Sequence, residues 1–296
     1  MRQVLAYDFM QRALLAALLI GLAAPAVGTF LVQRRLSLLG DGIGHIALTG
    51  VALGLVTSTS PLLGAVVVSV LGAILIELMR SSGRTGGDLA LALLFYGGLA
   101  GGVLVTNFAP GGSTSNLLSY LFGSISSVSR EDLYVIAGLV VAVFAVLAVF
   151  GRELFLLCQD EEMARASGVR VRFLSILLAV VAALTIVVAM RVVGLLLVSA
   201  LMVVPVAAAQ QLTRGFKATA ALAMVFGVLS ALGGLTASYQ FSVGEVNISP
   251  GPAIVVTALA LFTVSAVLGP LTRRRAARAV RGPLESGRET ALEEAS

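Results

Sequence analysis

The sequence predicts an all-α protein that crosses a membrane about nine times, and three observations support this fold class. Of the 296 residues, 58% are hydrophobic and 12% are charged, whereas about a quarter of the residues in a soluble domain are charged. Several apolar stretches reach the roughly 20 residues that a helix needs to cross a bilayer. The alternating segments of about ten residues that are typical of transmembrane barrels are absent from the sequence. We therefore expect a polytopic bundle of helices embedded in lipid.

Nine hydrophobic segments are the predicted spans. They cover residues 13–33, 37–58, 62–79, 89–107, 132–150, 173–190, 192–212, 218–238 and 253–271. Cytoplasmic connections of membrane proteins are enriched in lysine and arginine. If the connection 151–172 is cytoplasmic, sixteen of the 20 basic residues fall on the cytoplasmic side. This count predicts an external N-terminus and a cytoplasmic C-terminus.

The chain divides into an N-terminal segment (1–12), a transmembrane domain (13–272) and a basic tail (273–296) that is predicted to be cytoplasmic and disordered, because it is polar and low in apolar residues. Two connections are long. The external connection 108–131 contains an apolar piece, 117–122, that we expect to form a short helix at the outer face. The cytoplasmic connection 151–172 has a helix-forming centre that ends at Gly168.

Glycines and prolines occur at specific positions within the predicted spans. Glycines recur at the spacing that lets membrane helices approach closely: Gly40 and Gly44, Gly50 and Gly54, Gly97 and Gly101, and Gly98 and Gly102. Pro25 and Pro205 lie within predicted spans, where a proline is expected to kink or break the helix. A break at Pro205 would leave backbone carbonyls available to line a cavity.

Several function classes are excluded by residues that the sequence lacks. Cys158 is the single cysteine, so neither an intrachain disulfide nor a cysteine-based zinc motif can form. The single lysine, Lys217, follows Phe216, so no phosphate-binding GxxxxGK[ST] loop exists. Active transport would therefore need a separate ATPase or an ion gradient. With one histidine and no Ser/His/Asp set we expect no enzyme activity, and with its arginines in short connections and the tail we expect no nucleic-acid partner.

Asp41 and His45 are the first candidate site. They lie one helical turn apart, so both side chains are expected on the same helix face. Carboxylate and imidazole are ligands of zinc, manganese and iron, and a two-fold dimer would supply two copies of each. At 1.5 Å per residue, His45 would lie roughly 15 Å from Arg35, near the middle of the bilayer. In the alternative interpretation, Asp41 caps the span and His45 has a structural role.

The charges of the 151–172 connection are the second candidate site. Asp160, Glu161 and Glu162 begin its helical piece and Arg165 lies near its end, an order that suits the helix dipole. Such a helix could dock into a partner, or it could be a solvated connector. Glu77, near the inner end of the third span, is expected to snorkel or cap, and Glu245 is expected to be a surface charge.

Several segments resemble the integral-membrane permease subunits of ABC-type zinc and manganese uptake systems, the ZnuB-like class. They are RRLSLLGDGIGHIALTGVALG (34–54), LFGSISSVSREDL (121–133), CQDEEMARASGVRV (158–171), VVGLLLVSALMVVPVAAA (192–209) and SPGPAIVVTALALF (249–262). The resemblance implies a fold similar to the cobalamin-importer class of permeases, with two copies forming the translocation path. The sequence departs from the family pattern at Gly44 and Thr49, where the family commonly has serine and proline. We therefore expect the helix after Asp41 and His45 to be less kinked.

The resemblance also implies roles for both candidate sites. Asp41 and His45 correspond to the metal-handling pair of the channel. The stretch from Asp160 to Gly168, with Glu161, Glu162 and Arg165, resembles the coupling helix that seats in the ATPase subunit. The implied partners are that ATPase, an extracytoplasmic metal-binding protein, a second and identical permease protomer, and the lipid of a bacterial cytoplasmic membrane.

The function that follows is import of a divalent metal into the cytoplasm, driven by the separate ATPase. Zinc is the first expectation, with manganese or iron as alternatives, and the metal is cargo and not a tightly bound cofactor. Two other interpretations stay open from the residues alone. One is a permease of the same architecture for an iron chelate or a cofactor, and the other is a gradient-driven transporter in which Asp41 and His45 relay protons.

Overall fold

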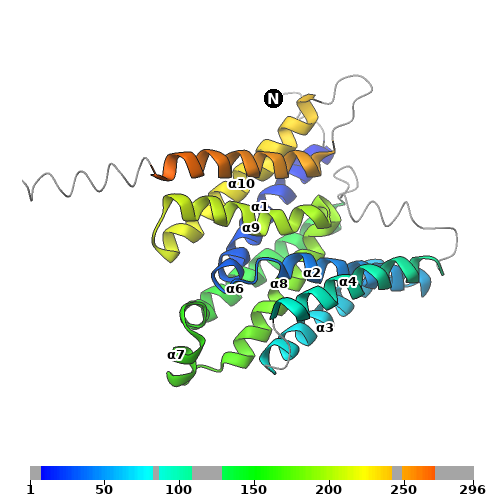
Figure 1. The fold of residues 1–296 in the computed structure, drawn as a ribbon. Coiled ribbons are helices and arrows are strands. Elements are labelled where there is room, and N and C mark those ends of the chain that lie inside the picture. The colour runs from blue at the N-terminus through cyan, green and yellow to red at the C-terminus, as the bar shows by residue number, and fades with distance from the viewer. Residues whose placement is uncertain (1–7, 83–86, 109–128, 242–248, 271–296) are drawn as a thin grey trace, which may run out of the picture.

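A computed structural model describes residues 8–82, 87–108, 129–241 and 249–270, and every regular element in these ranges is a helix (Figure 1). The elements are α1 (Asp8–Gln33), α2 (Leu39–Val56), α3 (Pro61–Ser81), α4 (Gly87–Thr106), α6 (Arg130–Gln159), α7 (Glu161–Ala166), α8 (Val171–Val193), α9 (Leu195–Leu212) and α10 (Phe216–Phe241). A last helix, Pro250–Pro270, follows α10.

The predicted series of spans is confirmed among the described residues. Each of the nine predicted segments coincides with one long helix. Eight of these helices are long and apolar enough to cross a membrane, and the apolar part of α9, Leu197–Leu212, is shorter. The short helix α7 lies between α6 and α8, within the predicted cytoplasmic connection. The fold class is therefore that of an all-α polytopic membrane protein.

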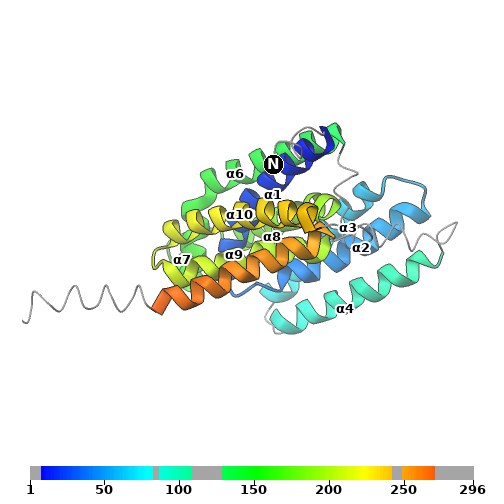
Figure 2. The ribbon, with the colours of Figure 1, turned by 90° about the horizontal axis from the view of Figure 1, so that it is seen from above.

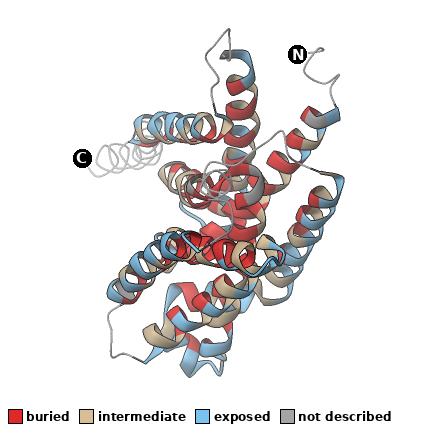
Figure 3. Cartoon of the chain, turned by 90° about the vertical axis from the view of Figure 1, so that its right-hand side faces the viewer, coloured by how far each residue is buried: buried red, intermediate tan, exposed pale blue. Residues whose placement is uncertain are grey.

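The bundle has two groups of helices with α8 between them (Figures 1 and 2). One group is α2 with α3 and α4, and the other is α1 with α6, α9 and α10. Helix α8 packs against α3 on one side and against α1, α6 and α9 on the other. Buried residues concentrate along the central helices, whereas the outward faces of the peripheral helices are exposed (Figure 3). In a bilayer, those outward faces contact lipid or another subunit.

Glycines place three neighbours against α2, as their spacing predicts. A Cβ atom on Gly50 would lie 2.7 Å from Ala65 Cα of α3, and one on Gly98 of α4 would lie 2.7 Å from Ile46 N. A Cβ atom on Gly40 would lie 3.3 Å from Ser199 Oγ of α9. Gly97, by contrast, faces open space. The close approach of α3, α4 and α9 thus depends on glycine at specific positions on α2 and α4.

The structure differs from the sequence prediction at several helix boundaries. Helix α1 begins at Asp8, inside the segment expected to precede it, and α6 continues to Gln159, nine residues past its predicted end at 150. Neither proline breaks its helix, because α1 is continuous through Pro25 and α9 through Pro205. The interruption falls instead at Gly194, where φ is 94°. Glycine adopts that left-handed conformation without steric cost, so it ends α8 and begins α9 within one residue.

Parts of the prediction lie outside the described residues. These are most of the external connection 108–131 with its apolar piece, Glu245, and the basic tail.

Candidate functional site

Asp41 and His45 lie on α2, as predicted, and the structure argues against a capping role for Asp41. Helix α2 begins at Leu39, its N-cap residue is Leu38, and no side chain caps it. Asp41 is therefore the third helical residue. Its carboxylate makes no hydrogen bond or ion pair with the part of the chain that the structure describes. The charge is thus available to a ligand.

His45 lies nearer to one end of its helix than a continuous helix from Arg35 would place it. Arg35 has a φ of 59°, so the chain turns sharply between α1 and α2. Because α2 starts at Leu39, His45 lies only about 9 Å along the helix axis from that start. The estimate of roughly 15 Å from Arg35 assumed an unbroken helix, and the chain is not helical between Arg35 and Leu38. The pair sits in the first two turns of α2, close to the end that carries Arg34 and Arg35.

The His45 ring is buried but incompletely satisfied. The residue is 9% exposed, and the Phe95 ring of α4 packs edge-on against the imidazole, with 4.3 Å between ring centroids and 72° between ring planes. Nδ1 has no hydrogen-bond partner among the described residues. An unpaired buried polar atom costs about 1–3 kcal/mol, so functional sites are where such atoms are expected. The unpaired nitrogen one turn from a free carboxylate fits a metal-binding pair.

Asp41 also lines a pocket with a volume of ≈ 350 Å³ between α2 and α4. The other lining residues are Leu38, Leu91, Ala92, Phe95 and Tyr96. Within the described ranges, no group of three or more His, Cys, Asp or Glu side chains is close enough to hold a metal ion. One chain therefore offers two strong candidate ligands, Asp41 at the pocket and His45 buried one turn further along α2, which is too few for a closed site.

Thr49 fixes α4 against the histidine turn of α2. Its Oγ1 donates a hydrogen bond of 2.6 Å to the Gly98 carbonyl of α4. This is the position at which the family pattern has proline. A proline there has no hydroxyl, so it could not make this bond.

The second candidate site is α7, and its predicted residues have distinct positions. Asp160 is the N-cap, and its Oδ1 accepts from the backbone N–H groups of Glu162 (2.8 Å) and Met163 (3.0 Å). Arg165 pairs with Glu161 at 3.3 Å. Beyond the helix, Gly168 takes a φ of 80° and turns the chain toward α8.

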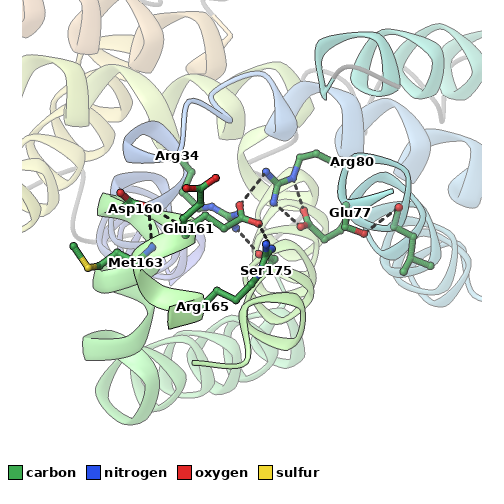
Figure 4. Close-up of polar contacts among 11 residues, drawn as sticks. Arg34, Glu77, Arg80, Asp160, Glu161, Met163, Arg165 and Ser175 are labelled. Atoms are coloured by element: carbon green, nitrogen blue, oxygen red, sulfur yellow. Dashed lines mark hydrogen bonds and ion pairs between the residues drawn. The ribbon is translucent and has the colours of Figure 1, made fainter. Parts of the chain in front are cut away.

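Glu161 contacts residues that the sequence analysis did not assign to the site (Figure 4). Its Oε2 lies 3.4 Å from Arg34 and 3.9 Å from Arg80. Arg80 also pairs with Glu77, with a shortest N–O distance of 2.6 Å. Glu77 is therefore a buried partner of an ion-pair network and not a snorkelling charge. The sequence indicated this proximity only through the predicted topology, which puts Arg34, Arg80 and the 151–172 connection on one side of the membrane.

Known proteins resemble this chain over nearly its whole length. The sequence profile of the ABC 3 transport family matches residues 6–269. The chain belongs to the ABC 3 transport family. Among members, the manganese transport system membrane protein MntC of Halalkalibacterium halodurans is 35% identical over 269 residues, 90% of each chain. The manganese import system permease protein ScaB of Streptococcus gordonii is 32% identical over 267 residues, 90% of this chain and 94% of ScaB.

Solved structures agree with this assignment. The structure of PsaBC from Streptococcus pneumoniae in complex with a Fab matches with a TM-score of 0.77 and 32% identity, covering 88% of this chain and 91% of that one. A metal-chelate type ABC transporter in an inward-facing conformation matches with a TM-score of 0.69 over 90% of this chain. At 18% identity the second match concerns the fold alone. The predicted resemblance to permease subunits of ABC-type zinc and manganese uptake systems is confirmed, and this ABC 3 family member is a multi-pass membrane transport subunit.

Proposed function

We propose that this permease subunit carries a divalent transition metal into the cytoplasm, with manganese as the first candidate. The observation that carries the proposal is the Asp41/His45 pair, in which a buried imidazole has an unpaired nitrogen one turn from an unpaired carboxylate. The names of MntC and ScaB support manganese. Zinc, the metal that the sequence first suggested, accepts the same ligands, so a direct comparison of the two metals is part of the test.

A second copy of the chain completes the proposed site. One chain supplies two strong ligands, and a two-fold axis next to the pair would supply two aspartates and two histidines. Helix α4 leaves apolar side chains of its outward face exposed, including Leu93, Tyr96 and Val103. A dimer contact on the α4 side of the pocket would bury these groups and bring the two pairs together.

Transport energy comes from a separate ATPase in this proposal, since the sequence contains no phosphate-binding loop. Helix α7 is the surface where that subunit docks, because Glu162 and Met163 are exposed on it. Arg34, Arg80 and Arg165 gather at this end of the bundle (Figure 4), which supports a cytoplasmic location for α7 and, with it, a cytoplasmic C-terminus. A metal-binding protein would deliver the ion at the opposite face of the bacterial cytoplasmic membrane.

Weak ligation suits this mechanism. A site that passes ions on must bind them well enough to admit them and loosely enough to release them. Two mixed Asp/His pairs, each with its aspartate at a pocket and without further strong ligands in the described part of the chain, meet that requirement. ATP binding would close the ATPase dimer, move α7 and open the site toward the cytoplasm.

The test compares metal uptake in cells that lack this protein and express either the wild type, H45A or D41N. We expect manganese uptake to fall by about tenfold or more in both variants, because loss of a partner to a ligand already costs about 10–100-fold in metal affinity. Parallel measurements of zinc and iron identify the cargo. Co-purification of the ATPase subunit should be unchanged.

The matched control is S230A, which removes a buried hydroxyl of α10 that bonds only within its own helix, to Phe226 O at 2.7 Å. This variant should retain wild-type uptake. Wild-type uptake of all three metals by H45A would overturn the proposal.

A further inference from the structure

Glu161 is the point at which two other segments of the chain meet α7. Its carboxylate pairs with Arg34 from the α1–α2 connection at 3.4 Å, with Arg80 of α3 at 3.9 Å and with Arg165 of α7 itself at 3.3 Å. Arg34 also donates to Ser175 Oγ of α8 at 3.0 Å. Figure 4 shows these side chains converging on Glu161. We call Arg34, Glu77, Arg80 and Glu161 the four-charge network.

The charges of this network balance only as a set. The Arg34 side chain is 4% exposed and that of Glu77 is 5% exposed, so both are held away from water. Burial, and next the nearby Arg80 guanidinium, lower the pKa of Arg34, while Glu77 and Glu161 oppose this effect. Without Glu161, two neighbouring arginines would share the single carboxylate of Glu77. Glu161 therefore contributes to the charge balance of both guanidinium groups, while Glu77 is the main partner of Arg80.

Arg34 is connected stiffly to the helix that carries Asp41 and His45. The turn between α1 and α2 is closed by backbone hydrogen bonds from Leu36 N–H to Leu31 O (2.8 Å) and from Leu39 N–H to Leu36 O (3.0 Å). The Leu36 side chain is buried in the core. If Glu161, the ion-pair partner of Arg34, is displaced, the movement therefore reaches the first turn of α2, where Asp41 lies.

Arg80 gives a second connection to α2 through α3. Arg80 is in the last turn of α3, and α3 packs along α2 at the contact between Gly50 and Gly64, where no side chain separates the backbones. By contrast, α7 packs on few other helices in the described part of the chain, mainly on its neighbour α6 and less on α8. The Glu161 side chain therefore joins α7 to the α1–α2 connection and to α3.

We propose that Glu161 is a positioning residue that transmits the movement of α7 to the Asp41/His45 pair through its ion pairs with Arg34 and Arg80. This inference rests on the proposed function and names the residues that link the two candidate sites. Glu161 is 41% exposed and its contacts with Arg34 and Arg80 are long, so these ion pairs contribute little to static stability. Contacts of this kind suit a connection that changes length and partner during a transport cycle.

The experiment measures manganese imported per ATP hydrolysed by the full complex of this chain with its ATPase subunit in proteoliposomes, with the metal-binding protein present. The variants are E161Q, R34Q and R80Q. We expect the number of ions imported per ATP to fall about tenfold in E161Q and severalfold in each arginine variant. The double variant E161Q/R34Q should be no worse than E161Q, since both changes interrupt one connection. E161D keeps the negative charge and should retain most of the wild-type number of manganese ions imported per ATP.

Two exposed residues of α6 provide matched controls, because E153Q and R152Q remove the same charges outside the network. Both should keep the wild-type ratio. The proposal is overturned if E161Q imports wild-type amounts of metal per ATP, if ATP hydrolysis and import fall in proportion, or if E161Q no longer binds the ATPase while E161D does. Absence of manganese import by the wild-type complex would count against the proposed function instead, so the two failures are distinguishable.

Discussion

Gly98 holds α4 against the backbone of the histidine turn, and its replacement by alanine should separate the two helices. A Cβ atom at Gly98 would lie 2.7 Å from Ile46 N and 2.9 Å from His45 C. Ordinary contacts begin at 3.4 Å, so the shortfall is about 0.7 Å. The obstructing atoms belong to the backbone, and a change of rotamer cannot relieve them. Helix α4 must therefore move away from α2 at the level of His45.

The adjacent residue supplies the control. Gly97 is on the same helix, and a Cβ atom there meets nothing within 4 Å. Alanine is favoured over glycine in a helix by about 1 kcal/mol, and this gain applies to both variants. Overpacking costs about 1–3 kcal/mol and applies only to G98A. We therefore expect G98A to be less stable than G97A by about 1–3 kcal/mol, because the helix-propensity gain cancels in the comparison.

The assay is thermal unfolding of the purified chain in detergent, followed by the loss of the monodisperse peak. With a shift of about 2–4 °C per kcal/mol, the midpoint of G98A should lie on the order of 2–12 °C below that of G97A. Manganese uptake should fall severalfold in G98A alone, since Phe95 and its contact with His45 move with α4. An equal or higher midpoint for G98A would refute the claim that glycine sets the α2–α4 distance.

Two further predictions concern single hydrogen bonds. T49V removes the donor to the Gly98 carbonyl and should lower the free energy of unfolding by about 1 kcal/mol. Its unfolding midpoint should lie below that of T263V, a control whose exposed hydroxyl bonds within its own helix. Equal midpoints would show that the Thr49 bond does not hold α4. S129A removes the N-cap of α6, where the Ser129 hydroxyl accepts from Asp132 N–H at 3.1 Å in a capping box. It should cost about 1 kcal/mol and speed hydrogen exchange in the first turn of α6, and unchanged exchange there would contradict the capping role.

The sequence was sufficient for the features that depend on local composition. The spans follow from hydrophobic length, because a helix that crosses a bilayer needs about 20 apolar residues whatever its neighbours are. The placement of Asp41 and His45 on one helix face follows from their spacing of four. Asp160 as the N-cap of α7 and a turn at Gly168, just past its end, were also predictable, since capping and left-handed turns are decided by adjacent residues.

Packing between distant segments decided the rest. Glu161 and Arg34 are separated by 127 positions, and no periodicity in the sequence indicates that they meet. The unpaired His45 nitrogen, the Phe95 ring against it and the break at Gly194 instead of Pro205 likewise depend on which helix lies beside which. The sequence by itself determined which helices form and which side chains are candidate metal ligands. The tertiary structure alone decided their contacts, because helix spacing is set by close packing at glycines and by ion pairs between helix ends.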